Sequence, residues 1–170
     1  MTPAAIPSDP GTYALVLACS KTGALRIGKL GTLVLQPGFC LYVGSAFGPG
    51  GLAARIRHHT QIAARPHWHV DYLRAACDLI EVWYTTATKR QEHSWAMALA
   101  RLPGSEVPMQ GFGSSDCRCE AHLFWFQKPP SDRAFRQRVR ALVSTTRPPS
   151  ERRSGYPSNI LLKWTVSTSP

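Results

Sequence analysis

A basic stretch that follows a cluster of glycines carries the side chains best suited to phosphate chemistry. The run 42–59, YVGSAFGPGGLAARIRHH, begins like a strand, breaks on glycines and continues with the amphipathic pattern of a helix. Arg55 offers a planar fork for phosphate oxygens and can offset the charge that builds up on them in a transition state. His59 follows one helical turn later, so it shares a face with Arg55 and is suited to position water or transfer a proton near neutral pH.

The overall charge of the chain points to a phosphate-rich partner. Its 170 residues include 20 Lys and Arg against 10 Asp and Glu, a formal net charge of +10 at pH 7. A field of this sign attracts nucleic acid, although composition alone is equally compatible with a basic protein that binds none. The opening MTPAAIPSDP lacks the pattern of a secretory signal, and no run reaches the roughly 18 apolar residues of a membrane span. We therefore expect a cytoplasmic protein without a membrane partner.

The glycine cluster also matches nucleotide-binding motifs in part. It lacks the Gly-Lys-Ser/Thr ending of a Walker phosphate loop, which excludes that motif. The run from Gly48 to Ala53 has the spacing Gly-x-Gly-x-x-Ala of a dinucleotide fingerprint, and Asp71 follows about where a ribose-binding acid is expected. Because residues 45–47 separate the strand from Gly48 and basic side chains crowd the helix, this match is the weaker alternative.

The elements that must position these residues indicate the α/β class. Apolar and β-favouring runs predict three main strands, a hairpin excursion and a last short strand, at 12–19, 39–46, 79–88, 26–38 and 122–126. Amphipathic runs predict helices that begin near Leu52 and Lys89 and end at Pro66 and Pro103. We expect a small, mainly antiparallel three-stranded sheet flanked by helices.

The ends of the chain differ in composition from its middle. Residues 1–10 contain three prolines and little to pack, which indicates a flexible leader. Residues 128–170 are rich in Pro, Ser and Thr and include a basic helical patch, which indicates a flexible basic tail. The predicted domain therefore spans residues 11–127, and the arginines of the tail would add salt-sensitive affinity for nucleic acid.

Two tyrosine motifs on neighbouring predicted strands resemble a known family. Gly11-Thr12-Tyr13 and Tyr42-Val43-Gly44 are similar to the paired GIY and YIG motifs of the GIY-YIG endonucleases. The runs IGKLG, YVGSAFGPGGL, HWHVDYL and FGSSDCRCEAHLF more closely resemble one uncharacterised GIY-YIG-like group, the domain of unknown function 123, some of whose members are fused to endonuclease III. The resemblance covers roughly residues 11 to 126 and implies a GIY-YIG-like fold.

The resemblance implies a metal-dependent endonuclease that hydrolyses phosphodiester bonds, with DNA favoured over RNA and a DNA-repair protein as a further partner. The implied catalytic residues are Tyr13, Tyr42, Arg55, His59 and Glu92. Glu92 would bind a single Mg²⁺ or Mn²⁺. If Tyr13 is the base, its phenol must lose a proton from a reference pKa of about 10, which costs about 4 kcal/mol near neutral pH unless Arg55, Tyr42 or the metal lowers that pKa. Expected nucleic-acid contacts are Lys29, Ser45, Arg57, His58 and Trp68.

One departure from the family pattern favours a different function class. Many GIY-YIG enzymes carry an asparagine late in the domain, whereas the only asparagine of this chain, Asn159, lies in the predicted tail. Ser115 or Asp116 would have to take its place. The alternative is a catalytically inactive GIY-YIG-like module that binds nucleic acid through its basic helix.

A second group of potential ligands surrounds two histidine and cysteine runs. His67, His69 and Asp71 alternate in a way that would place them on one face of a strand, and Cys117, Cys119 and His122 form a Cys-x-Cys-x-x-His run. Since Cys-x-Cys is not the usual Cys-x-x-Cys knuckle, we do not expect structural zinc, and both groups would shape the rim of the site. The five cysteines are odd in number, so we expect reduced thiols.

Overall fold

Seven strands and four helices form the described part of the chain, residues 5–145 and 162–166 of a computed structural model. The strands are β1 (Gly11–Cys19), β2 (Gly23–Ile27), β3 (Gly31–Leu35), β4 (Gly38–Ala46), β5 (Asp78–Thr86), β6 (Leu123–Phe126) and β7 (Leu162–Thr165). The helices are α1 (Gly51–Thr60), α2 (His69–Arg74), α3 (Glu92–Ala100) and α4 (Asp132–Thr145). Within these residues, no helix is both long and apolar enough to cross a membrane.

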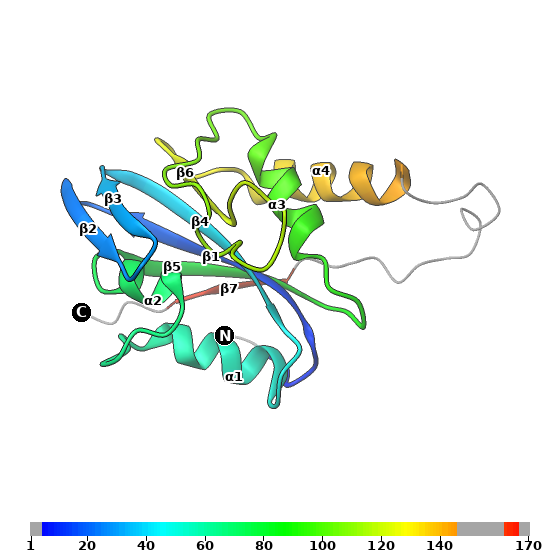
Figure 1. Cartoon of the computed structure of the whole chain (residues 1–170). Helices are drawn as coiled ribbons and strands as arrows, with labels where there is room; N and C mark the ends of the chain where they lie inside the picture. Colours follow the sequence, from blue (N-terminus) through cyan, green and yellow to red (C-terminus); the bar gives the residue numbers. More distant parts are fainter. Residues whose placement is uncertain (1–4, 146–161, 167–170) are drawn as a thin grey trace.

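The central sheet separates two apolar cores. Its strand order is β6-β4-β1-β5-β7, with every pair antiparallel, and β2 and β3 form a separate hairpin. Strand β1 is buried on both faces, which explains its nearly continuous apolar sequence. One core lies between the sheet and α1, α2 and the hairpin, and the other lies between the sheet and α3 and α4 (Figure 1).

The sheet is larger than the sequence predicts. It has five strands rather than three, because β6 pairs with β4 and β7 pairs with β5 along the two outer edges. The run 122–126 is a strand as predicted, but it extends the sheet instead of lying outside it. Strand β7 is short and comes from the predicted tail, and its Lys163 forms an ion pair with Glu81 of β5 at 2.8 Å.

The prediction of a flexible tail is wrong for two segments after residue 128. Helix α4 buries Phe135 and Val139 in the core beside α3, and Phe135 packs its ring against Trp83 and Trp95. The sequence shows a basic patch here because the arginines of α4 occupy the outer face of an amphipathic helix. One of them, Arg136, forms an ion pair with Asp132 at 3.1 Å. Residues 146–161, which include Asn159, lie outside the described part.

The predicted leader is also attached to the domain over its described residues. The backbone N–H groups of Leu52 and Ala53, in the first turn of α1, donate to the carbonyl oxygens of Asp9 and Pro7 at 3.0 and 2.9 Å. A helix begins with N–H groups that lack partners inside the helix, and the leader supplies acceptors for two of them. Proline-rich sequence therefore indicates an extended segment here, but not a free one.

The expectation of reduced thiols is wrong for one pair of cysteines. Cys19, at the end of β1, and Cys77, between α2 and β5, form a disulfide across 58 residues of sequence. Sequence spacing does not reveal this pair, because strand pairing between β1 and β5 brings the two residues together. Cys40, Cys117 and Cys119 are free thiols, as predicted.

Candidate active site

A pocket of about 470 Å³ opens on the α1 side of the sheet, where β1 and β4 meet the starts of α2 and α3. Four of the five residues with implied catalytic roles line it: Tyr13, Tyr42, Arg55 and Glu92. They come from β1, β4, α1 and α3, four elements that are separate in sequence. Two residues with expected nucleic-acid contacts, Ser45 and Trp68, also line the pocket, together with His67, His69, Arg90, Ser115, Asp116 and His122.

The paired strands fix the position of Tyr13. Tyr13 lies directly opposite Gly44 in the register of β1 and β4. A Cβ atom at Gly44 would collide with the Tyr13 hydroxyl, so the glycine makes room for the phenol. Position 44 of the Tyr42-Val43-Gly44 motif therefore requires glycine for a steric reason: a side chain there would prevent Tyr13 from lying across the neighbouring strand.

His59 lies behind Tyr13 and does not line the pocket. Its Nε2 atom is 2.9 Å from the Tyr13 hydroxyl, and the His59 side chain is 1% exposed. Burial lowers the pKa of His59 to about 3, with smaller contributions from His58 and Arg55 that outweigh the opposing effect of Asp71. The expectation of an imidazole that titrates near neutral pH is therefore wrong, because the ring is removed from water. His59 is neutral at pH 7 and can act on substrate only through Tyr13.

Asp71 is the charged centre of this region. Its carboxylate accepts hydrogen bonds from the backbone N–H groups of His67 and Trp68 at 2.9 and 3.0 Å, and from His58 Nε2 at 3.0 Å. Burial raises the pKa of Asp71, but these three donors outweigh it, so the net pKa lies below its ordinary value. Oδ1 of Asp71 is also 3.9 Å from His59 Nδ1, which has no hydrogen-bond partner. Tyr13, His58, His59 and Asp71 are called the buried histidine cluster below.

The strand expected around His67, His69 and Asp71 is instead the start of helix α2. Asp71 lies in the first turn of that helix, where its carboxylate binds the N–H groups just before it, as an N-terminal acid should. His69 points to the loop after α3, and its Nδ1 accepts a hydrogen bond from the N–H of Gly113 at 3.0 Å. The three residues therefore do not share a face, because the short helix replaces the alternation of a strand.

Two arginines border the pocket, and only one was expected. The guanidinium of Arg55 lies 4.2 Å from the centre of the Trp68 ring, so the indole holds it by a cation–π contact. Arg90 donates to the Ser45 hydroxyl at 2.9 Å and lies over the Phe47 ring at 5.1 Å. Arg90 stands in the turn before α3, where no motif or periodicity distinguishes it from a surface arginine.

The loop after α3 completes the rim. The backbone of His122 donates to Phe112 and accepts from Val43, which fastens the loop to β4. Gly113 has a φ of +71°, and a Cβ there would lie 2.7 Å from the Tyr42 ring. Burial raises the pKa of Tyr42, and more than offsets the opposite effect of Arg55, so this phenol stays protonated at neutral pH.

Three expected contacts lie away from the pocket wall. Lys29 is exposed in the turn between β2 and β3, and Arg57 is exposed on the outer face of α1. His58 is half-buried, bonded to Asp71 and packed edge-on against Trp68, with ring centres 4.8 Å apart. His58 therefore supports the site from the side rather than lining it.

The amide donors of the first turn of α1 are not free to bind a nucleotide. The N–H groups of Gly51, Leu52, Ala53 and Ala54 all donate to carbonyl oxygens of the chain itself. A dinucleotide fingerprint needs these groups to face the pyrophosphate. The structure thus argues against dinucleotide binding at this junction.

Comparison with protein-family models gives a match for this chain. The family model described as Domain of unknown function DUF123 matches residues 12–144. The chain belongs to the DUF123 family. No curated protein and no solved structure matches it. The matched span runs from β1 through the pocket to the end of α4, so this DUF123 domain includes a helix that the sequence places in a tail.

The pocket of this DUF123 domain combines cations, hydroxyls and carboxylates. Arg55 and Arg90 can hold an anion, and Tyr13 and Tyr42 present phenol groups to the same space. Glu92, with 16% of its side chain exposed, and Asp116 supply carboxylate oxygens. Hard oxygen donors of this kind suit magnesium or manganese. The donor set fits an anionic substrate that carries a divalent cation.

Proposed function

We propose that this DUF123 domain is a nucleic-acid-binding protein that hydrolyses phosphodiester bonds, a divalent-metal-dependent endonuclease of the GIY-YIG type that acts on DNA in preference to RNA. The observation that carries the proposal is the convergence of Tyr13, Tyr42, Arg55 and Glu92 on one pocket. These are four of the five residues that the resemblance implies, and four separate elements bring them together. A net charge of +10 supports a polyanionic substrate.

In this proposal the arginines bind the scissile phosphate. Arg55 is preorganised by Trp68, so little side-chain entropy is lost when it meets the phosphate oxygens. Arg90 is held by Ser45 and Phe47 and contributes a second positive charge. Charge accumulates on the phosphoryl oxygens in the transition state, and fixed cations stabilise it more than they stabilise the substrate.

The Tyr13 hydroxyl would position the attacking water. In this proposal His59 carries its proton on Nδ1, so Tyr13 donates to Nε2 across 2.9 Å, and a lone pair of the phenol oxygen is left to accept a hydrogen bond from water in the pocket. As water attacks phosphorus, its proton passes to the Tyr13 oxygen while the Tyr13 proton passes to His59. The nearby Asp71 carboxylate stabilises the resulting imidazolium. Tyr13 thereby avoids becoming a free phenolate, which its burial disfavours strongly because burial raises its pKa well above the usual value.

Glu92 would hold the divalent cation, with Asp116 as a second carboxylate on the same rim. A bound Mg²⁺ or Mn²⁺ would supply Lewis-acid stabilisation of the leaving oxygen. Asp116 is exposed in the loop, so it is free to approach a cation or the substrate. It also lies where a polar residue is needed if the missing asparagine of the family pattern is to be replaced.

A catalytically inactive binding module is the second candidate. The observation that favours it is that none of the described residues is an asparagine, while burial keeps both pocket tyrosines protonated. Such a module would use the same arginines to bind nucleic acid and would have no turnover.

Cleavage of end-labelled DNA and RNA separates the two candidates. Single-stranded, duplex and branched DNA and single-stranded RNA are incubated with magnesium or manganese. Arg55→Ala and Glu92→Gln should each lower cleavage by about 100-fold or more. Arg101→Ala and Glu106→Gln are matched controls, since both residues are exposed and outside the pocket wall, and they should retain cleavage. Binding without cleavage of every substrate would exclude the endonuclease.

The cellular setting follows from the same resemblance and is part of the proposal. We expect a cytoplasmic protein that acts beside a DNA-repair enzyme, as the endonuclease III fusions of the similar group imply. The Cys19–Cys77 pair makes the location measurable, because cysteine pairs are usually kept reduced in the cytosol and do not form disulfides there. Thiol labelling of this pair in intact cells would show a reduced pair if the location is cytoplasmic.

A further inference from the structure

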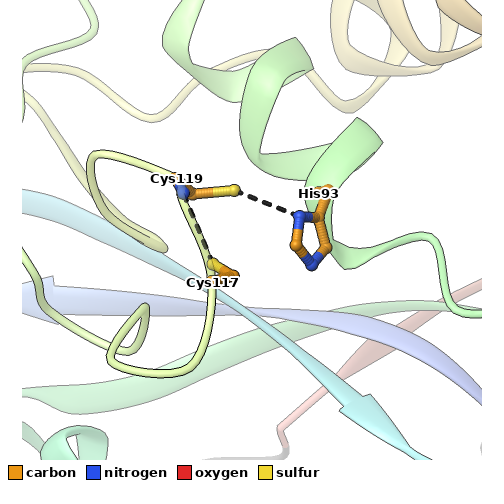
Figure 2. A group of neighbouring side chains, drawn as sticks. All are labelled: His93, Cys117 and Cys119. Carbon is orange, nitrogen blue, oxygen red and sulfur yellow. Dashed lines mark hydrogen bonds between the residues drawn. The ribbon is translucent and has the colours of Figure 1, made fainter.

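Four soft or borderline ligand groups meet beside the pocket, on the side of α3. Figure 2 shows His93, from the first turn of α3, facing Cys117 and Cys119 of the loop. Cys119 Sγ is 3.4 Å from His93 Nδ1, and the ligand atoms of these three residues all lie within 4.8 Å of one another. His122, at the end of the same loop, places its Nε2 3.4 Å from Cys117 Sγ. His93, Cys117, Cys119 and His122 are called the thiol cluster.

The spacing among His93, Cys117 and Cys119 suits a zinc ion, and His122, which is outside that group of three, lies beside Cys117. With Zn–S near 2.3 Å and Zn–N near 2.05 Å, a tetrahedral site separates neighbouring sulfur and nitrogen ligands by about 3.6 Å. The two sulfur-to-nitrogen distances of 3.4 Å agree with that separation. Two thiolates and two imidazoles are a common structural ligand set for zinc.

Ordinary loop packing explains the thiol cluster less well. A thiol is a weak hydrogen-bond donor, so two separate sulfur-to-imidazole contacts contribute little stability to a loop by themselves. Cys117 and Cys119 are both free thiols and do not pair with each other. His122 is 3% exposed, and the hydrogen-bond contact of its Nε2 is with a sulfur atom rather than with a stronger donor or acceptor. A cation that favours sulfur and nitrogen together would give these contacts a clear role.

The buried histidine cluster is the contrasting case. His58, His59 and Asp71 are also close enough to bind an ion, but hydrogen bonds already use both Asp71 oxygens, His58 Nε2 and His59 Nε2. Most ligand atoms of that group are therefore already in use, and His59 Nδ1 is the buried atom left without a hydrogen-bond partner. Magnesium and manganese prefer oxygen ligands and do not suit two sulfur atoms, which leaves zinc as the fitting ion for the thiol cluster.

We propose that His93, Cys117 and Cys119 bind one structural zinc ion that ties the loop to the start of α3, with His122, beside Cys117, as the fourth ligand. The sequence alone did not lead to this expectation, because it contains only the Cys-x-Cys-x-x-His part, and His93 comes from a distant helix. The ion would hold the segment that carries Ser115 and Asp116 at the pocket rim. It would also hold His93, whose Nε2 is 3.7 Å from the Glu92 carboxylate, in the orientation that a carboxylate partner gives to a zinc-bound imidazole.

Metal analysis of the untagged full-length chain tests the proposal independently of any nuclease activity. After exposure to zinc and removal of free metal, the chain should retain about one zinc per molecule. Cobalt in its place should give thiolate-to-metal charge transfer and the intense visible bands of tetrahedral Co²⁺. Cys119→Ser and His93→Gln should each weaken zinc binding at least about 10-fold, measured by competition with a chromogenic chelator.

Matched variants keep the result interpretable. Cys40→Ala removes the free thiol outside the thiol cluster, and His67→Gln removes an exposed histidine elsewhere, so both should bind zinc like the parent chain. His93 is 54% exposed, so His93→Gln decides the matter even if Cys119→Ser fails to fold. A chain that takes up neither zinc nor cobalt, or that binds them as tightly in His93→Gln as in His67→Gln, overturns the zinc site and leaves the proposed nuclease chemistry unaffected.

Discussion

The buried histidine cluster and the thiol cluster lie on opposite sides of one pocket and are built on different principles. In the buried histidine cluster, His58 Nε2 and His59 Nε2 each have a hydrogen-bond partner, and His59 Nδ1 has none. Backbone N–H groups and His58 compensate the charge of Asp71. In the second, sulfur faces nitrogen across 3.4 Å with no charge to balance it. The comparison shows that proximity of ligand-type residues is a weak signal, and that what the neighbouring atoms already bind decides whether a metal is needed.

The strongest way to separate the two clusters is to remove one group from each. Tyr13→Phe keeps the ring but deletes the hydroxyl, and it should lower cleavage by about 100-fold to 1000-fold with zinc content unchanged. His93→Gln should weaken zinc binding at least about 10-fold and lower cleavage only about 10-fold, through Glu92. Parallel measurement of turnover and metal content checks both. If each variant lost both properties, the two clusters would be one functional unit.

A substitution at Gly44 tests the packing of Tyr13 in the buried histidine cluster without changing the thiol cluster. Gly44→Ala places a methyl group against the Tyr13 hydroxyl and should destabilise the fold by about 1–3 kcal/mol through overpacking. Gly48→Ala is the control, because a Cβ there meets no neighbouring atom. Urea unfolding of the two variants measures the difference. Equal stability of Gly44→Ala and Gly48→Ala would mean that Tyr13 is not held where the register places it.

Near neutral pH, the smallest expected effect is the pH dependence of stability that His59 contributes. The unfolded chain protonates this histidine near pH 6.5, whereas the folded chain does so only near pH 3, so stability is intact above about pH 6.5 and falls as pH drops towards 3. The loss should be at most about 1.4 kcal/mol per pH unit in this window. Unfolding at pH 7, 6 and 5, compared with His59→Gln, isolates the contribution. Parallel curves for the two proteins would contradict a buried, neutral His59.

Local patterns were enough to predict much of the fold. The alternation and apolar runs of β1, β4 and β5 lie where the sequence indicates strands, and α1 and α3 begin within three residues of their predicted starts. The five-stranded sheet was not predicted, because β7 is short and paired through residues distant in sequence. Helix α2 was missed because its six residues are too few for a helical period to stand out from the spacing of His67, His69 and Asp71.

The candidate site was predictable to the extent that its residues belong to motifs. Tyr13, Tyr42, Arg55 and Glu92 lie together as the resemblance implies, but the burial of His59 could not be read from its position one turn after Arg55. Arg90 was missed because its partners, Ser45 and Phe47, are distant in sequence, and His93 was missed because it depends on how the loop after α3 folds. Long-range packing, which no local pattern records, decides these placements.

The carbonyl groups of Pro7 and Asp9 also bear on how this protein should be shortened or joined to other domains. A chain that starts at Gly11 would leave the amide donors of Leu52 and Ala53 without their acceptors, at the head of the helix that carries Arg55. One that stops at residue 127 would uncover the apolar surface that Phe135 and Val139 now cover. Because β7 also pairs with β5, engineered fusions should keep the span from residue 5 to residue 166 intact and place any linker outside it.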